Sequence, residues 1–180
     1  MMKVLVAYAT RHGSTAGIAE RIAAALSAGG HPADAVSVED AGPVEGYDAV
    51  VLGGAAYMFH WLKPALQFAR RHQAALAQRP VWLFSSGPLG TADVDAEGKD
   101  VRTAARPQEF DELTRTLSPR GERVFFGAYD PDQKPVGLGE RLTRAMPAGR
   151  ELLPEGDFRD WDDIDAWATQ IAEELNGLAE

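Results

Sequence analysis

Residues 3–17 read Lys-Val-Leu-Val-Ala-Tyr-Ala-Thr-Arg-His-Gly-Ser-Thr-Ala-Gly, an apolar run that leads into a loop rich in hydroxyl groups. The apolar part, Lys3–Ala9, predicts a strand that is buried on both faces. A helix is predicted over Ser14–Ala28, because apolar residues recur there on one face, at Ile18, Ile22 and Leu26. A helix N-terminus carries unsatisfied N–H groups and the positive end of the helix dipole, and both attract a phosphate. We therefore expect a phosphate-bearing ligand where the first strand ends; the alternative is that the hydroxyl groups only cap the helix.

The composition limits the class of protein. A chain of 180 residues, 45% of them hydrophobic, suits one domain over residues 1–180 with a sizeable core. The absence of cysteine excludes disulfides, thiolate nucleophiles and cysteine-bound metals, and the net charge of −9 argues against nucleic-acid binding. The longest apolar run, residues 49–59, is too short for a membrane span, which needs about 20 residues, and no signal-peptide pattern is present. We expect a cytoplasmic protein with at most peripheral membrane contact.

Short apolar runs alternate with segments of helical period along the chain, which is typical of an α/β fold with a parallel sheet. Five strands are predicted, over residues 3–9, 35–38, 48–54, 80–86 and 123–129. Helices are predicted over 14–28, from Lys63-Pro64 onward, around 107–117, near 138–146 and over 162–175, while most of 130–160 should be irregular. This pattern indicates a doubly wound sandwich, in which ligands bind beyond the carboxyl ends of the central strands.

Three loops should meet at that edge of the sheet: residues 10–15, 55–61 and 86–91. The second loop begins Ala55-Ala56-Tyr57-Met58-Phe59, and its aromatic residues Tyr57, Phe59 and Trp61 are candidates for stacking on a flat ring. The alternative is that they pack under the next helix. The third loop, Ser86-Gly87-Pro88-Leu89-Gly90, offers backbone groups for the polar edge of a ring, or is an ordinary strand–helix turn.

Other nucleotide and catalytic patterns are missing. The sequence lacks G-x-x-x-x-G-K-[ST], G-x-G-x-x-G after the first strand, and G-x-S-x-G, which argues against P-loop, dinucleotide-binding and esterase sites. A receiver domain would need a carboxylate at the end of a central strand, where this chain has Ala9-Thr10 and Gly53-Gly54. The four histidines are dispersed, so we expect no metal site, and no side chain stands out as a catalytic acid or base.

The strand Val4–Tyr8 and the loop Thr10-Arg11-His12-Gly13-Ser14-Thr15 together resemble the T-x-x-G-x-T opening of flavodoxin-like FMN proteins. The resemblance implies a five-stranded parallel sheet in the order 2-1-3-4-5. It also implies that this loop holds the FMN phosphate and that the flavin ring lies between the second and third loops. The site residues carried over are Thr10, Arg11, His12, Gly13, Ser14, Thr15, Ala55, Ala56, Tyr57, Met58, Phe59, Ser86, Gly87, Pro88, Leu89 and Gly90.

The nearest branch resembled is the menaquinone-dependent protoporphyrinogen dehydrogenase family. The match lies in Tyr47–Ala55, similar to a Y-D-x-V-V-x-G-A strand, and in Asp160-Trp161 before the last helix. The chain departs from that branch at Ala56–Phe59, where the family tends to have a basic–aromatic pair. The segment 130–150 corresponds to a longer, more basic insertion implicated in quinone or membrane contact.

The expected function is an FMN-binding redox protein, since the flavin carries the chemistry and the protein supplies binding and electrostatics. Three hypotheses about the function stay open. The first is an electron carrier with a redox partner protein, and the second is a dehydrogenase acting on a protoporphyrinogen, a quinone or another small organic substrate. The third is a flavin-free interaction module on the same scaffold.

Overall fold

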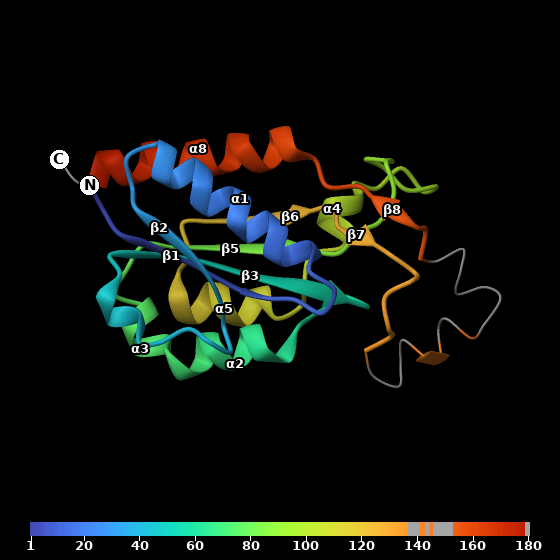
Figure 1. Cartoon of the computed structure of the whole chain (residues 1–180), viewed down its shortest axis with the longest axis horizontal. Coiled ribbons are helices and arrows are strands. Elements are labelled where there is room, and N and C mark those ends of the chain that lie inside the picture. The colour runs from blue at the N-terminus through green and yellow to red at the C-terminus, as the bar shows by residue number, and fades with distance from the viewer. Residues whose placement is uncertain (137–140, 143–144, 146–152, 179–180) are drawn as a thin grey trace.

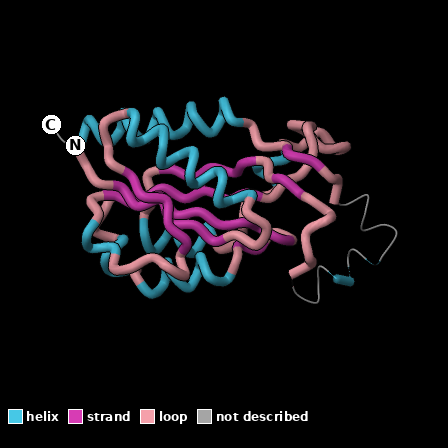
Figure 2. Tube along the Cα trace, in the orientation of Figure 1, coloured by secondary structure: helices cyan, strands magenta, loops and turns pink. Residues whose placement is uncertain are grey.

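The computed structural model describes residues 1–136, 141–142, 145 and 153–178. A parallel sheet lies between two layers of helices, with α1 and α8 on one face and α2, α3 and α5 on the other (Figures 1 and 2). The helices are α1 (Ser14–Ala28), α2 (Lys63–Arg71), α3 (Gln73–Leu76), α4 (Val101–Ala104), α5 (Phe110–Leu117) and α8 (Trp161–Leu178), with a 3₁₀ turn, η1 (Val44–Gly46). The helix α1 has the predicted bounds.

The sheet is built from β2 (Ala33–Ser37), β1 (Val4–Ala9), β3 (Ala49–Tyr57), β5 (Val81–Ser86) and β6 (Gly121–Phe125), which lie in this order and are all parallel. Counted along the described chain, these parallel strands have the order 2-1-3-4-5. The structure therefore confirms the predicted α/β, flavodoxin-like doubly wound architecture. One difference from the prediction is the additional two-residue strand β4 (His60–Trp61), which pairs antiparallel with β3.

The central strands bury both of their faces, which explains why their sequences are almost continuously apolar. Leu5, Leu52 and Leu83 point to the core under α2, α3 and α5. The residues that follow or precede them, such as Val6 and Val51, point to the core under α1 and α8. On that second face, Arg21 of α1 makes a bidentate ion pair with Asp165 of α8, at 2.7 and 2.5 Å.

Three predicted segments differ from the structure. The second strand lies at 33–37 rather than 35–38, and β3 continues three residues beyond Gly54 because β4 folds back on its end. The predicted strand 123–129 is split: β6 ends at Phe125, and β7 (Ala128–Tyr129) pairs instead with β8 (Gly156–Asp157). The split arises because Gly127 N–H donates to the Pro88 carbonyl and so draws the chain away from the sheet.

The helix predicted near 138–146 lies largely outside the described residues. In the described parts of the chain, no helix is long and apolar enough to cross a membrane.

Candidate functional site

The loops that follow β1, β3 and β5 come together at the carboxyl edge of the sheet, as the sequence predicts. The beginning of α1 and the end of β3 lie at the same end of the molecule (Figure 1). We call residues 10–15 the first loop, residues 57–61 the hairpin and residues 86–91 the third loop.

The first loop is a tight turn that leaves the start of α1 open. Gly13 has a φ of 83°, a left-handed conformation that glycine adopts without strain, and its N–H donates to Thr10 Oγ1 at 3.0 Å. No side chain of the described residues caps α1, and no atom lies within 4 Å of a Cβ built on Gly13. The N–H groups of the first helical turn are therefore available to an anion, which is the geometry of a phosphate site.

Besides Thr10, the other two hydroxyl groups of the first loop also have partners inside the protein. Thr15 is fully buried, and its Oγ1 lies 2.8 Å from Ser86 Oγ, which joins the first loop to the third. Ser14 Oγ accepts a hydrogen bond from Ala128 N–H at 2.9 Å and keeps its own hydrogen for another acceptor. The hydroxyl of Thr15 thus lies behind the surface, while Ser14 remains half-buried at it.

Arg11 links the first loop to the hairpin. Its guanidinium lies over the ring of Tyr57, 4.5 Å from the ring centre, and the Arg11 side chain is exposed. A cation–π contact at an exposed position contributes about 0.5–1 kcal/mol. His12 lines a pocket of about 460 Å³ beside the first loop, with Ser14, Tyr129, Glu155 and Arg159 also in its wall.

The tip of the hairpin is a two-residue turn in an unfavourable conformation. Met58 and Phe59 both have positive φ, 49° and 66°, and their side chains are 88% and 56% exposed. A turn with two positive φ values is normally formed by Asn-Gly, because bulky residues cost about 1–2 kcal/mol each in this region. Such a conformation persists only where surrounding contacts hold it.

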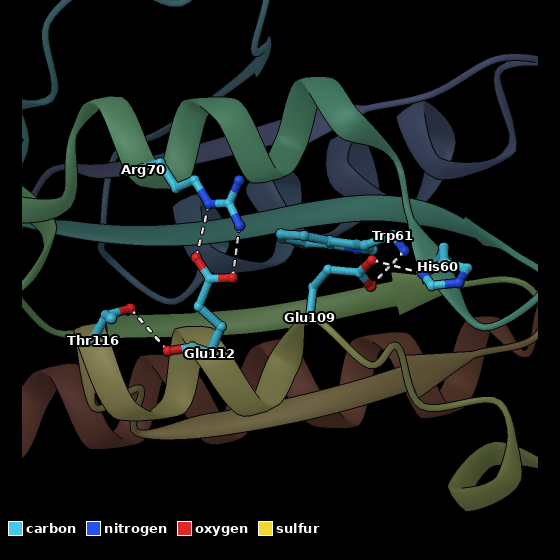
Figure 3. A network of polar contacts seen from close by, with 6 residues as sticks. All are labelled: His60, Trp61, Arg70, Glu109, Glu112 and Thr116. Atoms are coloured by element: carbon cyan, nitrogen blue, oxygen red, sulfur yellow. Dashed lines mark hydrogen bonds and ion pairs between the residues drawn. The ribbon is translucent and has the colours of Figure 1, made fainter.

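Those contacts come from the two residues that precede α5, of which Figure 3 shows Glu109. Gln108 N–H donates to the Phe59 carbonyl at 3.0 Å. The Glu109 carboxylate accepts from Trp61 N–H at 2.9 Å through one oxygen, and its other oxygen lies 2.9 Å from His60 Nδ1. Burial by itself raises the pKa of Glu109, but the hydrogen bonds from Trp61 N–H and His60 together hold it below its ordinary value. Hydrogen bonds to a charged group contribute about 1.5–3 kcal/mol, so these contacts match the strain of the turn.

Trp61 belongs to the core rather than to the ligand site. Its side chain is 2% exposed, its Nε1–H donates to the Gly54 carbonyl at 2.9 Å, and its ring meets Phe110 edge-on at 5.2 Å. A Cβ on Gly54 would lie 2.7 Å from Trp61 Nε1, so the glycine makes room for the indole. The alternative left open by the sequence therefore holds for Trp61, whereas Tyr57 and Phe59 reach the surface at the site.

The third loop is fixed at its beginning. Gly87 N–H donates to the Phe125 carbonyl at 3.3 Å, and a Cβ on Gly87 would lie 3.1 Å from the Ala56 carbonyl oxygen. Gly90 has a φ of 110°, which only glycine adopts readily. Residues 87–90 are half-buried, so the loop runs close beside the end of β3 and leaves its backbone at the surface.

Sequence reasoning missed several residues that shape the site. Glu109 and Ala128 are examples, since no pattern in the neighbouring sequence predicts that they contact the site. Arg159 Nη1 donates to the Ser14 carbonyl at 3.3 Å, and its guanidinium lies over the Trp161 ring at 4.5 Å. A Cβ on Gly17 would lie 2.6 Å from that nitrogen, so the glycine in the first turns of α1 was the one available signal.

Among the described residues, no group of three or more His, Asp or Glu side chains could hold a metal ion.

Comparison with known proteins identifies the family. A model of the flavodoxin domain matches residues 5–142, so the chain belongs to this family. No curated protein matches the chain.

Solved structures of similar fold include three flavodoxins. A flavodoxin from the domain Archaea has a TM-score of 0.60 at 16% identity, over 97% of this chain and 99% of that one. A variant of the Pseudomonas aeruginosa flavodoxin also has a TM-score of 0.60, at 14% identity, over 97% of this chain and 99% of that one. The two-electron reduced flavodoxin of Megasphaera elsdenii has a TM-score of 0.52, at 21% identity, over 73% of this chain and 90% of that one. At these identities the structures show the fold alone, and with the family match they support a flavin-binding redox protein.

Proposed function

We propose that this protein binds FMN at the carboxyl edge of the sheet and transfers electrons through it. The observation that carries the proposal is the uncapped start of α1 behind Gly13, placed beside the aromatic hairpin and the third loop. When bound, the flavin supplies the redox chemistry.

The first loop would hold the phosphate. Thr10 and Ser14 offer their hydroxyl hydrogens and α1 offers its first N–H groups, while Gly13 shapes the turn, Arg11 lies over Tyr57 and His12 lines the adjoining pocket. Thr15 and Ser86, also predicted as ligand contacts, would act from behind by fixing the first loop to the third. The segments Ala55–Phe59 and Gly87–Gly90 would flank the ring, with Tyr57 and Phe59 as its aromatic neighbours.

The test is a titration of the purified protein with FMN and with riboflavin, which lacks the phosphate. We expect one FMN per chain and a riboflavin affinity weaker by about 100-fold, because two or more charge-assisted hydrogen bonds to the phosphate are lost. Replacing Ser14 with Ala should weaken FMN and leave riboflavin unchanged. Absence of binding, or equal affinity for the two flavins, would contradict the proposal.

A second candidate is a dehydrogenase of the protoporphyrinogen or quinone type. The exposed apolar side chains of Met58 and Phe59 favour it, because they offer a hydrophobic surface beside the proposed ring site to a planar organic substrate. Anaerobic stopped-flow mixing of the FMN-loaded protein with protoporphyrinogen and with a menaquinol separates the two. A dehydrogenase is reduced directly by one of them, whereas a carrier with a protein partner is reduced by neither.

The setting of the reaction is also part of the proposal. We infer a cytoplasmic location, which is compatible with the absence of cysteine, and a redox partner protein as the donor or acceptor. Cell fractionation followed by immunodetection tests the location.

A further inference from the structure

The hairpin has few internal contacts that stabilise its conformation. Met58 and Phe59 stand in the left-handed region with mostly exposed side chains, so they gain little packing from the conformation. The strand β4 is only two residues long and pairs with β3 at two positions, Ala56 with Trp61 and Tyr57 with His60. Short hairpins of this kind are marginal in water without outside contacts.

The outside contacts converge on one carboxylate. Both oxygens of Glu109 are used, one at Trp61 N–H and the other at His60 Nδ1, and these are the two residues directly after the turn. The side chain of Glu109 is only 17% exposed, and its contact with Trp61 N–H is partly buried, whereas its contact with His60 lies at the surface. Figure 3 shows the carboxylate of Glu109 directed at the hairpin.

The next turn of α5 offers a natural contrast. Glu112 makes a bidentate ion pair with Arg70 of α2, at 2.8 and 2.7 Å. This pair joins α5 to α2, as Figure 3 shows, and none of its contacts reaches the hairpin. The two glutamates therefore lie three residues apart, Glu109 at the N-cap of α5 and Glu112 inside it, and they differ in what they hold.

We propose that Glu109 is a positioning residue: it holds the hairpin in its strained shape and thereby sets how tightly the flavin ring is covered. The inference rests on the proposed function, since it assigns the hairpin to the ring side of the FMN site. Because the phosphate is held separately by the first loop, loss of Glu109 should act on the ring alone. A looser cover admits water to the ring, which favours the more polar reduced form and raises the midpoint potential.

The experiment compares E109A, E109Q and E112A with the wild type. E109A should weaken FMN and riboflavin by the same factor, about tenfold, and should raise the midpoint potential. E109Q should restore affinity to within about threefold, because its amide oxygen accepts from Trp61 N–H and its amide nitrogen can donate to His60 Nδ1. E112A should stay within twofold of the wild type in both affinities and in potential.

A second measurement, made without flavin, tests the structural part of the inference, that Glu109 holds the hairpin. Amide hydrogen exchange followed by NMR should show Trp61 N–H exchanging at least tenfold faster in E109A than in the wild type or E112A. Unchanged exchange at Trp61 would overturn the inference. So would equal effects of E109A and E112A on flavin affinity, or a loss in E109A confined to FMN. If the wild type binds no flavin, the proposed function fails and this inference fails with it; if the wild type binds flavin normally, only the inference is at stake.

Discussion

The first loop and the hairpin meet where Arg11 lies over Tyr57, and they are built in opposite ways. The first loop takes its turn from neighbours, since Gly13 N–H bonds to Thr10, three residues away. The hairpin takes its shape from Glu109, which is 48 and 49 residues away from the groups that it holds. The turn at Gly13 is therefore encoded locally, although Ser14 and Thr15 beyond it also bond to distant residues, whereas the tip of the hairpin is held by a residue far along the chain. The comparison predicts that the first loop and the hairpin can be damaged separately.

The largest loss of stability should come from Gly54→Ala, because Gly54 lies against Trp61 at the base of the hairpin. Its Cβ would lie 2.7 Å from Trp61 Nε1 and 3.1 Å from Ala65 Cβ, so the indole must move. We expect a loss of about 3 kcal/mol in the free energy of unfolding, measured by urea denaturation. Gly46→Ala is the matched control, because no atom lies within 4 Å of its Cβ. Equal losses in the two variants would mean that Trp61 does not depend on Gly54.

Thr15→Val tests the connection behind the first loop. Valine keeps the shape of threonine but leaves the Ser86 hydroxyl buried without its partner, which should reduce the free energy of unfolding by about 2 kcal/mol. The double variant with Ser86→Ala should recover part of that loss, because both polar groups are then gone. Strictly additive losses in a double-mutant cycle would show that the two hydroxyls are not coupled.

The turn itself is the third target. Replacing Met58 with Asn and Phe59 with Gly gives the sequence that positive φ values favour, so stability should rise by about 1 kcal/mol in thermal unfolding. The same change removes an aromatic neighbour of the proposed ring site, so riboflavin affinity should fall. A gain in stability without loss of flavin affinity would show that Met58 and Phe59 do not contact the flavin.

The smallest effect is a pH dependence carried by Glu109. Its pKa in the folded protein is below the ordinary value, so its contribution to stability is complete above the pKa of the unfolded chain. That contribution is lost as the pH falls through the folded pKa. The stability advantage of the wild type over E109Q should therefore shrink in acid and stay constant near neutrality. The Trp61 amide shift should follow the same transition in the wild type, and should not move in E109Q.

The extent of sequence-based prediction follows the same division between local and distant contacts. The five parallel strands and the bounds of α1 could be predicted, because buried strands and an amphipathic helix leave their period in adjacent residues. The hairpin could not, since Met58-Phe59 lacks the Asn-Gly signal of such a turn. The break after Phe125 depends on hydrogen bonds of Gly127 and Ala128 to residues far earlier in the chain. Trp61 looked like a ring-stacking residue, because only the folded structure brings Gly54 and Phe110 against it.

The link between Ser14 and the later part of the chain has a consequence for biosynthesis. The first loop leaves the ribosome early, but Ala128 and Arg159, which bond to Ser14, are made more than a hundred residues afterwards. The helix α8, which packs over α1, follows later still. A nascent chain can therefore pair its central strands long before the turn of the first loop is braced. Under the proposed function, cofactor binding would follow the synthesis of Arg159, and a prematurely terminated chain would lack the bracing contacts of Ser14.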